Sequence, residues 1–578
     1  MSTIVLMVGG CGNYLGSELF TSLYGELQRA ASLDDNRTVH SLTNRFFSSP
    51  SPITRGVSLK PRCLLIDMEA KTVQNCLLRQ MSPPHHRQVG TSNFSVSEAN
   101  AGWCWDPKFA FWQQGGCGNN WALGHHVQGP NHRDTLERLL LSLAEEADAV
   151  SSILVLHSLA GGTGSGVGSF LTELCSDLLP ERTIASCCVW PFDSEVSTQA
   201  FNTVLSLASL QSSRCLAVVA HYISPTMNHI SAAYVELSDG IFIFDNARYA
   251  KILQRERGSR ATPTGAGMTE INCCIARDLL GCCLLPSSPW MPMPPRRVYP
   301  TRPTARSRWA RAPCQDSNPS ALRPLWDEAA GSAATCTLRG LVSDVVTHRA
   351  FKLLTCRYLP QGLAPLENSQ RLSPYTYPSL LRRLERMFAR ADTLDLHSPP
   401  SPAMPSSHRQ RQYAEVQQRE KNSPKLAETS QGMQPNAAVA AQLCMRGPAV
   451  RALQSDPMAN CSIGLWRYAA NPPQSLAAWL SLRIAARHCL LCDGETTDVQ
   501  HTTSVPQMFE GLLAPGSYGM HSPFCRCCCS TVQLGLDMLQ AGAFVHHYEQ
   551  FGVESHDLWG ALEQLQETAD AYGTLLPA

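Results

Sequence analysis

The chain has 578 residues, and its 47 Lys and Arg residues balance its 47 Asp and Glu residues, so the formal net charge is zero. This balance argues against nucleic acid as a partner, and no apolar run approaches the roughly 18 residues that a membrane-spanning helix requires. The opening residues lack the basic stretch of a secretory signal, so we interpret the 24 cysteines as reduced thiols in the cytoplasm.

One pattern repeats through the first 285 residues: a short apolar run ends in Gly, Pro or Asp and is followed by a segment with helical periodicity. This alternation is typical of an α/β fold in which helices cover both faces of a parallel sheet. We predict strands at Ile4–Val8, Leu64–Ile66, Ile153–Leu156, Cys187–Trp190, Leu216–Ala220 and Ile241–Phe244.

Helices are predicted between these strands. Leucines at every fourth position from Leu15 to Leu27 indicate a helix that packs on the sheet. The Asp-x-x-Glu sequence at Asp134–Glu137 predicts the start of a capped helix, and a further helix is expected to begin near Ser165. Helical periodicity also predicts two helices near the end of the sequence, at 531–550 and 556–572.

Three stretches lack periodicity and are rich in residues that disfavour regular structure. They are Pro286–Ala334, with many Pro and Arg, Ser398–Pro435, and Asp493–Pro523. Compact domains rarely contain structureless segments of this length, so we predict that these stretches are surface insertions or extended loops.

A glycine-rich sequence, AGGTGSGVG at Ala160–Gly168, lies between a predicted strand and a predicted helix. The four glycines and two small hydroxyl residues of Gly161–Gly166 allow backbone N–H groups to surround a phosphate at the positive end of a helix. The sequence is not a Walker A loop, because no Gly-Lys-Ser/Thr follows it. The earlier GGCGNYLG at Gly9–Gly16 has the wrong glycine spacing for a dinucleotide-binding fingerprint.

These two glycine sequences resemble loops of the tubulin superfamily, which bind the phosphates of GTP. GCGNNWALGHH at Gly116–His126 is similar to another loop of that family, and IDMEAKTV at Ile66–Val73 is similar to the loop whose acidic pair lies near Mg²⁺. The segment Trp190–Leu210 resembles the ribose loop and the helix after it. Because these sequences occur in the family's order, we identify a resemblance to a GTP-binding fold.

The resemblance implies specific ligand contacts. Asp67 and Glu69 would position Mg²⁺, Asn202 would contact the ribose, and Asn246 with Asn272 would contact the guanine. The full set of implied nucleotide-binding residues is Gly9, Gly10, Cys11, Gly12, Asn119, Ser158, Gly161, Gly162, Thr163, Gly164, Ser165, Gly166, Asp193, Asn202, Asn246, Met268 and Asn272.

Several positions depart from the family pattern. Gly10 and Tyr14 replace two glutamines near the phosphates, and Met268 replaces the aromatic residue that stacks on guanine. Gly340 occupies the position of a catalytic glutamate, and glycine cannot orient or polarise a water molecule. We therefore expect GTP binding with slow hydrolysis, unless Asp344 or a neighbouring subunit supplies the missing acid.

Within the superfamily the sequence is most similar to the δ branch, through Trp190–Leu210, Leu338–Gln361 and Phe544–Tyr572. This implies a cytoskeletal role with other tubulins or microtubules in centrioles and basal bodies, and in cilium or flagellum formation, with a nuclear location also open. The implied organisation is a guanine-nucleotide-binding Rossmann-like domain, an insertion, an α+β domain with loops near 398–435 and 493–523, and a C-terminal helical layer. The corresponding ranges are 1–285, 286–337, 338–527 and 528–578.

Two alternatives remain open from the sequence. The chain could be an active GTPase completed by a partner subunit, or an interaction scaffold that has lost nucleotide binding. Hydride transfer is disfavoured because no G-x-G-x-x-G follows a strand.

Two pairs of cysteines, Cys489-x-x-Cys492 and Cys525-x-x-Cys528, have the spacing of zinc ligands, although 32 residues separate the pairs. Buried thiols in a packed helix are the competing interpretation of these cysteines.

Overall fold

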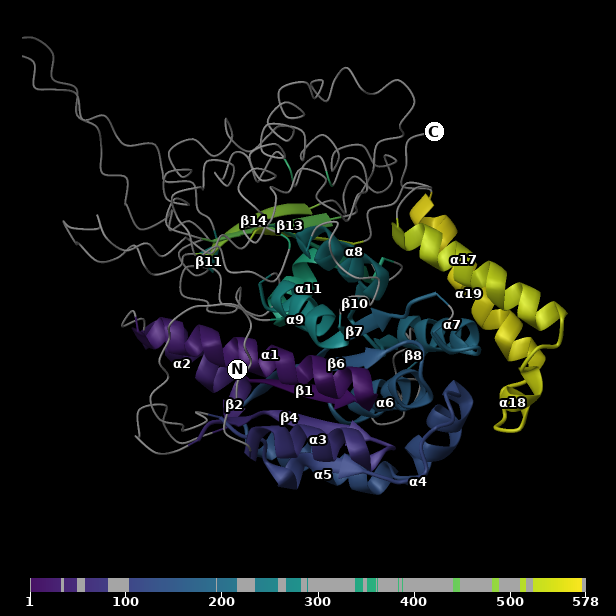
Figure 1. The fold of residues 1–578 in the computed structure, drawn as a ribbon, viewed down its shortest axis with the longest axis horizontal. Coiled ribbons are helices and arrows are strands. Elements are labelled where there is room, and N and C mark those ends of the chain that lie inside the picture. Colours follow the sequence, from purple (N-terminus) through teal and green to yellow (C-terminus); the bar gives the residue numbers. More distant parts are fainter. Residues whose placement is uncertain are drawn as a thin grey trace, which may run out of the picture.

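A computed structural model shows the fold of the chain (Figure 1). The structure describes residues 2–32, 36–48, 58–81, 103–193, 195–215, 234–257, 267–281, 288–289, 338–346, 351–359, 361, 383, 387, 440–446, 481–487, 510–515 and 523–573. Among the helices in these ranges, none combines the length and the apolar character needed to cross a membrane.

A central sheet of 11 strands organises the molecule, in the order β11-β14-β13-β15-β12-β10-β7-β6-β1-β4-β5. The seven strands from β12 to β5 are mutually parallel. They are β1 (Ser2–Val8), β4 (Cys63–Asp67), β5 (Ala110–Trp112), β6 (Val150–Ser158), β7 (Thr183–Trp190), β10 (Gly240–Asp245) and β12 (Leu353–Leu359). Strands β1, β6 and β7 are buried on both faces, and their segments Ile4–Val8, Ile153–Leu156 and Cys187–Trp190 are continuously apolar.

Beyond β12 the sheet continues in mixed directions. Strand β15 (Glu510–Pro515) is antiparallel to both β12 and β13 (Ala440–Arg446), whereas β13 is parallel to β14 (Ser481–Arg487). The short strand β11 (Ser288–Pro289) pairs with β14 at the sheet edge. Two further strand pairs form small separate sheets: β2 (Phe47–Ser48) with β3 (Lys60–Pro61), and β8 (Ser213–Cys215) with β9 (Tyr234–Glu236).

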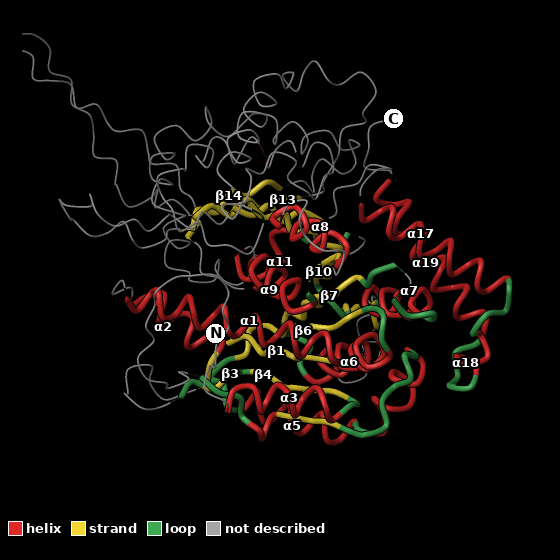
Figure 2. Tube along the Cα trace, in the orientation of Figure 1, coloured by secondary structure: helices red, strands yellow, loops and turns green. Residues whose placement is uncertain are grey.

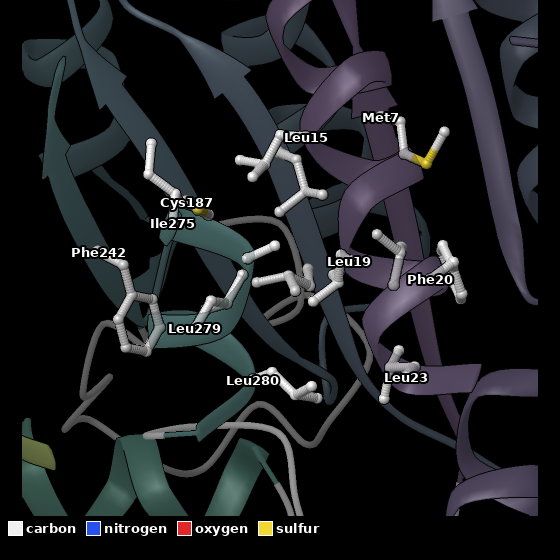
Figure 3. Packing of buried hydrophobic residues seen from close by; sticks show 14 of the residues in the cluster. Met7, Leu15, Leu19, Phe20, Leu23, Cys187, Phe242, Ile275, Leu279 and Leu280 are labelled. Carbon is white, nitrogen blue, oxygen red and sulfur yellow. The ribbon is translucent and has the colours of Figure 1, made fainter. Parts of the chain in front are cut away.

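One face of the parallel region is covered by helices from both the start and the middle of the chain. Helix α1 (Gly9–Ser32) packs beside α9 (Met268–Leu279), and leucines from the two helices meet over Met7, Cys187 and Phe242 of the sheet (Figure 3). The same apolar cluster includes residues of α2 (Asn36–Phe46), α3 (Ala70–Met81), α8 (Asn246–Arg257) and α11 (Leu338–Val345). Segment 338–345 therefore shares the core of the N-terminal region.

The opposite face carries two clusters. Helices α5 (Arg133–Glu145) and α6 (Gly168–Leu178) cover β1, β4 and β6, while α7 (Gln199–Gln211) covers β7 and β10. Helices α17 (Pro523–Gln540) and α19 (Ser555–Gly573) pack on α7, with α18 (Val545–Glu549) between them in sequence (Figures 1 and 2). The remaining short elements are η1 (Pro107–Phe109), η2 (Leu123–Gln128), α4 (Gly129–Asn131) and η3 (Gly162–Val167).

The α/β fold predicted from the sequence is confirmed, with five of the six predicted strands forming β1, β4, β6, β7 and β10. The sixth, Leu216–Ala220, lies outside the described residues. The predicted helices at Leu15–Leu27, after Ser165 and at 556–572 are α1, η3 with α6, and α19. The domain boundaries remain predictions, and most of the three aperiodic stretches lies outside the described residues.

Four sequence-based predictions need correction. Helix α5 starts at Arg133, and its N-cap residue His132 makes no side-chain capping bond, so Asp134 is not the cap. The single helix predicted at 531–550 is interrupted because Gly542 and Phe544 adopt left-handed backbone conformations, with φ of 64° and 62°. Strand β15 lies inside the predicted loop 493–523, and the short strand β11 lies inside the predicted insertion 286–337.

Two glycines of α1 provide a test of how closely this helix crosses the sheet. A Cβ at Gly12 would lie 2.1 Å from the Leu156 carbonyl oxygen, whereas a Cβ at exposed Gly25 would have no neighbour within 4 Å. We expect Gly12→Ala to lower the free energy of unfolding by ~2 kcal/mol or more. In the same helix, Gly25→Ala should raise it by about 0.5–1 kcal/mol. Urea unfolding of both variants without nucleotide measures this difference, and similar effects at the two positions would contradict the close crossing.

Candidate nucleotide-binding site

The candidate site lies at the carboxyl edge of the parallel strands. From β1 the chain crosses to β4 and β5 on one side, and β6, β7 and β10 follow on the other side. A crevice is expected where the direction of winding reverses, here between β1 and β6. The loops that leave these two strands begin at Gly9 and Leu159, so both glycine sequences predicted to bind phosphate lie at this point.

Close backbone contact holds three loops together at this edge. A Cβ on Gly9, which has φ of +72°, would lie 3.0 Å from the backbone nitrogen of Gly164. A Cβ on Gly162 would lie 2.6 Å from both the Asn120 nitrogen and the Cys117 carbonyl oxygen. Any larger residue at these positions would separate the loops, so the glycines bring 9–12, 116–120 and 161–166 into one cluster.

The glycine loop itself forms the N-terminal turn of a helix. Residues Gly162–Val167 form a π-helical turn, η3, which continues directly into α6. The Ser165 hydroxyl donates a hydrogen bond of 2.6 Å to the Gly161 carbonyl oxygen and is fully buried. Thr163 and Gly161 are partly exposed. This helix start is suited to an anion, because its first N–H groups have no partner within the helix.

Asn13 was not identified from the sequence, yet it joins two of the strands that form the edge. Its side-chain amide is fully buried and donates to the carbonyl oxygens of Gly9 and Ile66, at 2.9 and 3.0 Å. These bonds connect the start of α1 to the end of β4. Asn13 lies within the GGCGNYLG sequence, but single-sequence patterns do not distinguish such a bracing residue from a ligand contact.

The acidic pair lies at the end of β4. The Asp67 carboxylate is 3% exposed and accepts a hydrogen bond of 3.2 Å from the Glu69 backbone nitrogen, whereas the Glu69 side chain is exposed. Burial raises the pKa of the Asp67 carboxyl to about 6. A buried carboxylate without a nearby cation is electrostatically unfavourable, so the pair fits a hard cation such as Mg²⁺.

Asn202 lies on α7 and is hydrogen-bonded to two loops of the site. Its side chain is fully buried, and the amide nitrogen donates to the carbonyl oxygens of Asn119 and Ala160, at 2.8 and 2.6 Å. The amide oxygen accepts a hydrogen bond of 2.8 Å from the Trp121 backbone nitrogen. The ribose contact implied for Asn202 stays a prediction, and in the structure both ends of the amide are hydrogen-bonded within the protein. Asn202 holds two loops of the site at fixed positions.

Asn246 and Asn272, like Asn13, have a buried carbonyl oxygen that lacks a hydrogen-bond partner among the described residues. Asn246, the first residue of α8, is 3% exposed and Asn272 of α9 is 4% exposed. Buried polar atoms are usually satisfied, so the oxygens of Asn246 and Asn272 could accept hydrogen bonds from a ligand. Met268 begins α9 one turn before Asn272 and is 45% exposed.

The other predicted contacts are distributed around the same edge. Gly10 and Cys11 at the start of α1 and Ser158 at the end of β6 are partly exposed, whereas Gly12, Gly164 and Gly166 are buried against neighbouring backbone. Asn119 is exposed and has a positive φ of 51°. Asp193, after β7, is exposed as well. These positions remain predicted ligand contacts, since no ligand is part of the structure.

A buried histidine beneath the glycine loop was also missed from the sequence. His157 near the end of β6 is fully buried, its Nε2 lies 3.4 Å from the Cys188 Sγ, and its ring packs against Gly168. Burial lowers the pKa of His157 to about 4, so the ring is neutral at physiological pH. Because the ring is buried against the start of α6, we assign His157 a structural role beneath the loop.

The remaining candidate groups lie away from this edge or outside the described residues. Gly340 is in the first turn of α11 and is partly buried, and nothing is described of the Asp344 side chain. Cys489 and Cys492 lie outside the described residues, whereas Cys525 and Cys528 are in α17, where Cys528 is buried. Within the described part of the chain, no group of three or more potential metal-binding side chains occurs.

Comparison with known proteins gives this geometry a family context. The family described as Tubulin/FtsZ family, GTPase domain, matches residues 2–222. The whole chain aligns with the whole tubulin delta chain of dog (Canis lupus familiaris), at 23% identity over 589 residues, and of human, at 22% over 585 residues. The tubulin epsilon chain of mouse is 30% identical over 216 residues, which cover 36% of this chain and 41% of that protein.

The three loops of the candidate site, 9–12, 116–120 and 161–166, all lie within the residues that match the GTPase domain. The similarity to delta chains extends over the full length, including the described C-terminal helices. The chain is therefore a divergent member of the tubulin superfamily with a Tubulin/FtsZ GTPase domain in its N-terminal region.

Proposed function

We propose that the chain is a δ-tubulin-like protein that binds GTP with Mg²⁺ as a structural ligand and acts with other tubulins in microtubule assemblies. The observation that carries this proposal is the convergence of the loops 9–12, 116–120 and 161–166 at the winding reversal of a parallel sheet. A crevice bordered by backbone N–H groups and a helix start is chemically suited to a polyphosphate.

The phosphates would be held mainly by backbone groups of the glycine loop. Thr163 and the glycines around it present N–H donors at the start of η3, and loop 9–12 closes the other side. Mg²⁺ supplies charge neutralisation of the phosphates when it is bound. In this proposal Asp67 carries the buried negative charge that attracts the cation, and Glu69 adds an exposed carboxylate at the same edge.

Base recognition is assigned to Asn246 and Asn272. Guanine presents N–H donors on the edge where adenine presents an acceptor, so two unpartnered carbonyl oxygens favour guanine. Met268 provides a polarizable side chain for the purine face, although it is less rigid than an aromatic ring. This assignment explains why two oxygens remain buried without a partner in the protein itself.

The proposed biological role follows the δ branch of the family. By resemblance to that branch, the chain would support triplet microtubules of centrioles and basal bodies, and thereby cilium or flagellum formation. GTP would stabilise the folded, assembly-competent chain by mass action. Hydrolysis would be slow, because Gly340 offers no acid at the position that completes a neighbour's active site in related tubulins.

Replacement of an unpartnered asparagine tests the base assignment. Asn272→Leu removes the buried oxygen with little change in volume, so the nucleotide-free protein should be at least as stable as the unchanged chain. GTP affinity should fall by about tenfold or more, and the preference for GTP over ATP should decrease, because a hydrogen bond to guanine is lost. Titration with fluorescent GTP and ATP analogues measures both quantities. Unchanged affinity and selectivity would refute the assignment.

Gly340 provides a test of the hydrolysis claim. We expect low steady-state phosphate release from the unchanged chain at all protein concentrations. Gly340→Glu should increase phosphate release by about tenfold or more at concentrations where chains associate, because it restores a general acid–base group. A colorimetric phosphate assay across a concentration series measures this. Release from the unchanged chain that rises steeply with concentration would instead support an active GTPase completed between subunits.

A further inference from the structure

The C-terminal helical layer is hydrogen-bonded to the loops of the candidate site. Tyr548 of α18 is fully buried, and its hydroxyl lies 2.7 Å from the Asn202 amide oxygen and 3.3 Å from the Thr198 carbonyl oxygen. A tyrosine hydroxyl has only one hydrogen to donate, so the shorter contact identifies Asn202 as its main acceptor. The Tyr548 ring also packs edge-on against Phe201, with ring centroids 5.4 Å apart.

This contact reaches the site through the amide of Asn202. The same amide oxygen accepts the Trp121 N–H, and the amide nitrogen donates to the Asn119 and Ala160 carbonyl oxygens. The Thr198 hydroxyl adds a second bond to Asn119, of 2.7 Å. Asn119 has a positive φ, which asparagine adopts more readily than most other residues with a side chain, and these bonds fix its carbonyl group.

Two additional bonds join the same parts of the molecule. The Asn120 side-chain nitrogen donates to the His547 carbonyl oxygen at 2.8 Å, and its side-chain oxygen accepts the Ala122 N–H at 2.8 Å. The His126 Nδ1 lies 3.0 Å from the Phe551 carbonyl oxygen. Segment 119–126 is thus tied both to α7 and to the region around α18, more than 400 residues away in sequence.

We propose that Tyr548 is a positioning residue that, through Asn202, fixes loops 116–122 and 160–166 and couples the C-terminal helices to the nucleotide site. Without the Tyr548 hydroxyl, the Asn202 amide oxygen keeps only the Trp121 N–H as a donor. Loops 116–122 and 160–166 then become less ordered. The ordering of the loops is independent of any ligand, whereas the coupling to nucleotide rests on the proposed GTP binding. By linkage, nucleotide in the site would in turn order the region around α18.

Tyr572 offers a matched control in the same helical layer. It is also fully buried, lies on α19, and its hydroxyl accepts the Leu353 backbone N–H at 3.0 Å. Its ring contacts Phe351 edge-on, with centroids 4.9 Å apart. Tyr548→Phe and Tyr572→Phe therefore both remove a buried, hydrogen-bonded hydroxyl, but only the first contacts Asn202.

Hydrogen exchange of the nucleotide-free full chain is the first measurement. In Tyr548→Phe, amides of segment 117–124, including the Trp121 N–H, should exchange about five- to tenfold faster, while Tyr572→Phe should leave them unchanged. Comparable global stability of the two variants, measured by urea unfolding, shows that this effect is local. Equal exchange of segment 117–124 in both variants would overturn the proposal.

Titration with fluorescent GTP is the second measurement. Tyr548→Phe should weaken binding about fivefold or more, and Tyr572→Phe should bind within about twofold of the unchanged chain. Equal affinities in both variants would refute the coupling. If the unchanged chain binds no GTP, the proposed function fails, yet faster exchange in Tyr548→Phe alone would still establish the positioning of the loops.

Discussion

The architecture of the site depends on backbone-to-backbone contact among loops that leave the carboxyl ends of β1, β5 and β6. Gly9 and Gly162 allow this contact, since a Cβ at Gly9 would lie 3.0 Å from the Gly164 nitrogen, and a Cβ at Gly162 would lie 2.6 Å from backbone atoms of Cys117 and Asn120. Side chains cannot be inserted there without separating the loops. The donors available at this edge of the sheet are therefore main-chain N–H groups, whose positions are set by the sheet and by the helices that follow its strands.

Side-chain amides then hold this backbone cluster in place. Asn13 joins the ends of β1 and β4, and Asn202 joins loops 116–120 and 160–166. Both are buried, and both donate hydrogen bonds to main-chain carbonyl oxygens. Because the crowded loops exclude water, these side chains supply the hydrogen bonds that water would otherwise make. The carbonyl oxygens of Asn246 and Asn272 lack a partner in the described structure, as does that of Asn13, whereas both the amide nitrogen and the amide oxygen of Asn202 are hydrogen-bonded within the protein.

The parallel strands and the glycine loops could be predicted from the sequence because each has a strong local signal. Buried strands such as Ile153–Leu156 are continuously apolar, and Gly161–Gly166 follows one directly. Strand β5 is only three residues long, and β15 lies in sequence without alternation, so neither gives a periodic signal. The role of Asn202 depends on partners 42 to 346 residues away, which no local pattern encodes. The break between α17 and α18 depends on left-handed residues within a helical pattern.

The central claim is that this cluster of loops holds guanine nucleotide. The most direct measurement is to denature the purified full chain and to identify the released nucleotide by chromatography, with alanine at Thr163, Gly164 and Ser165 as a control variant. The account predicts about one GTP per chain, and none from the variant. Purified chain that is folded, yet releases no nucleotide and binds none when GTP and Mg²⁺ are supplied, would contradict it.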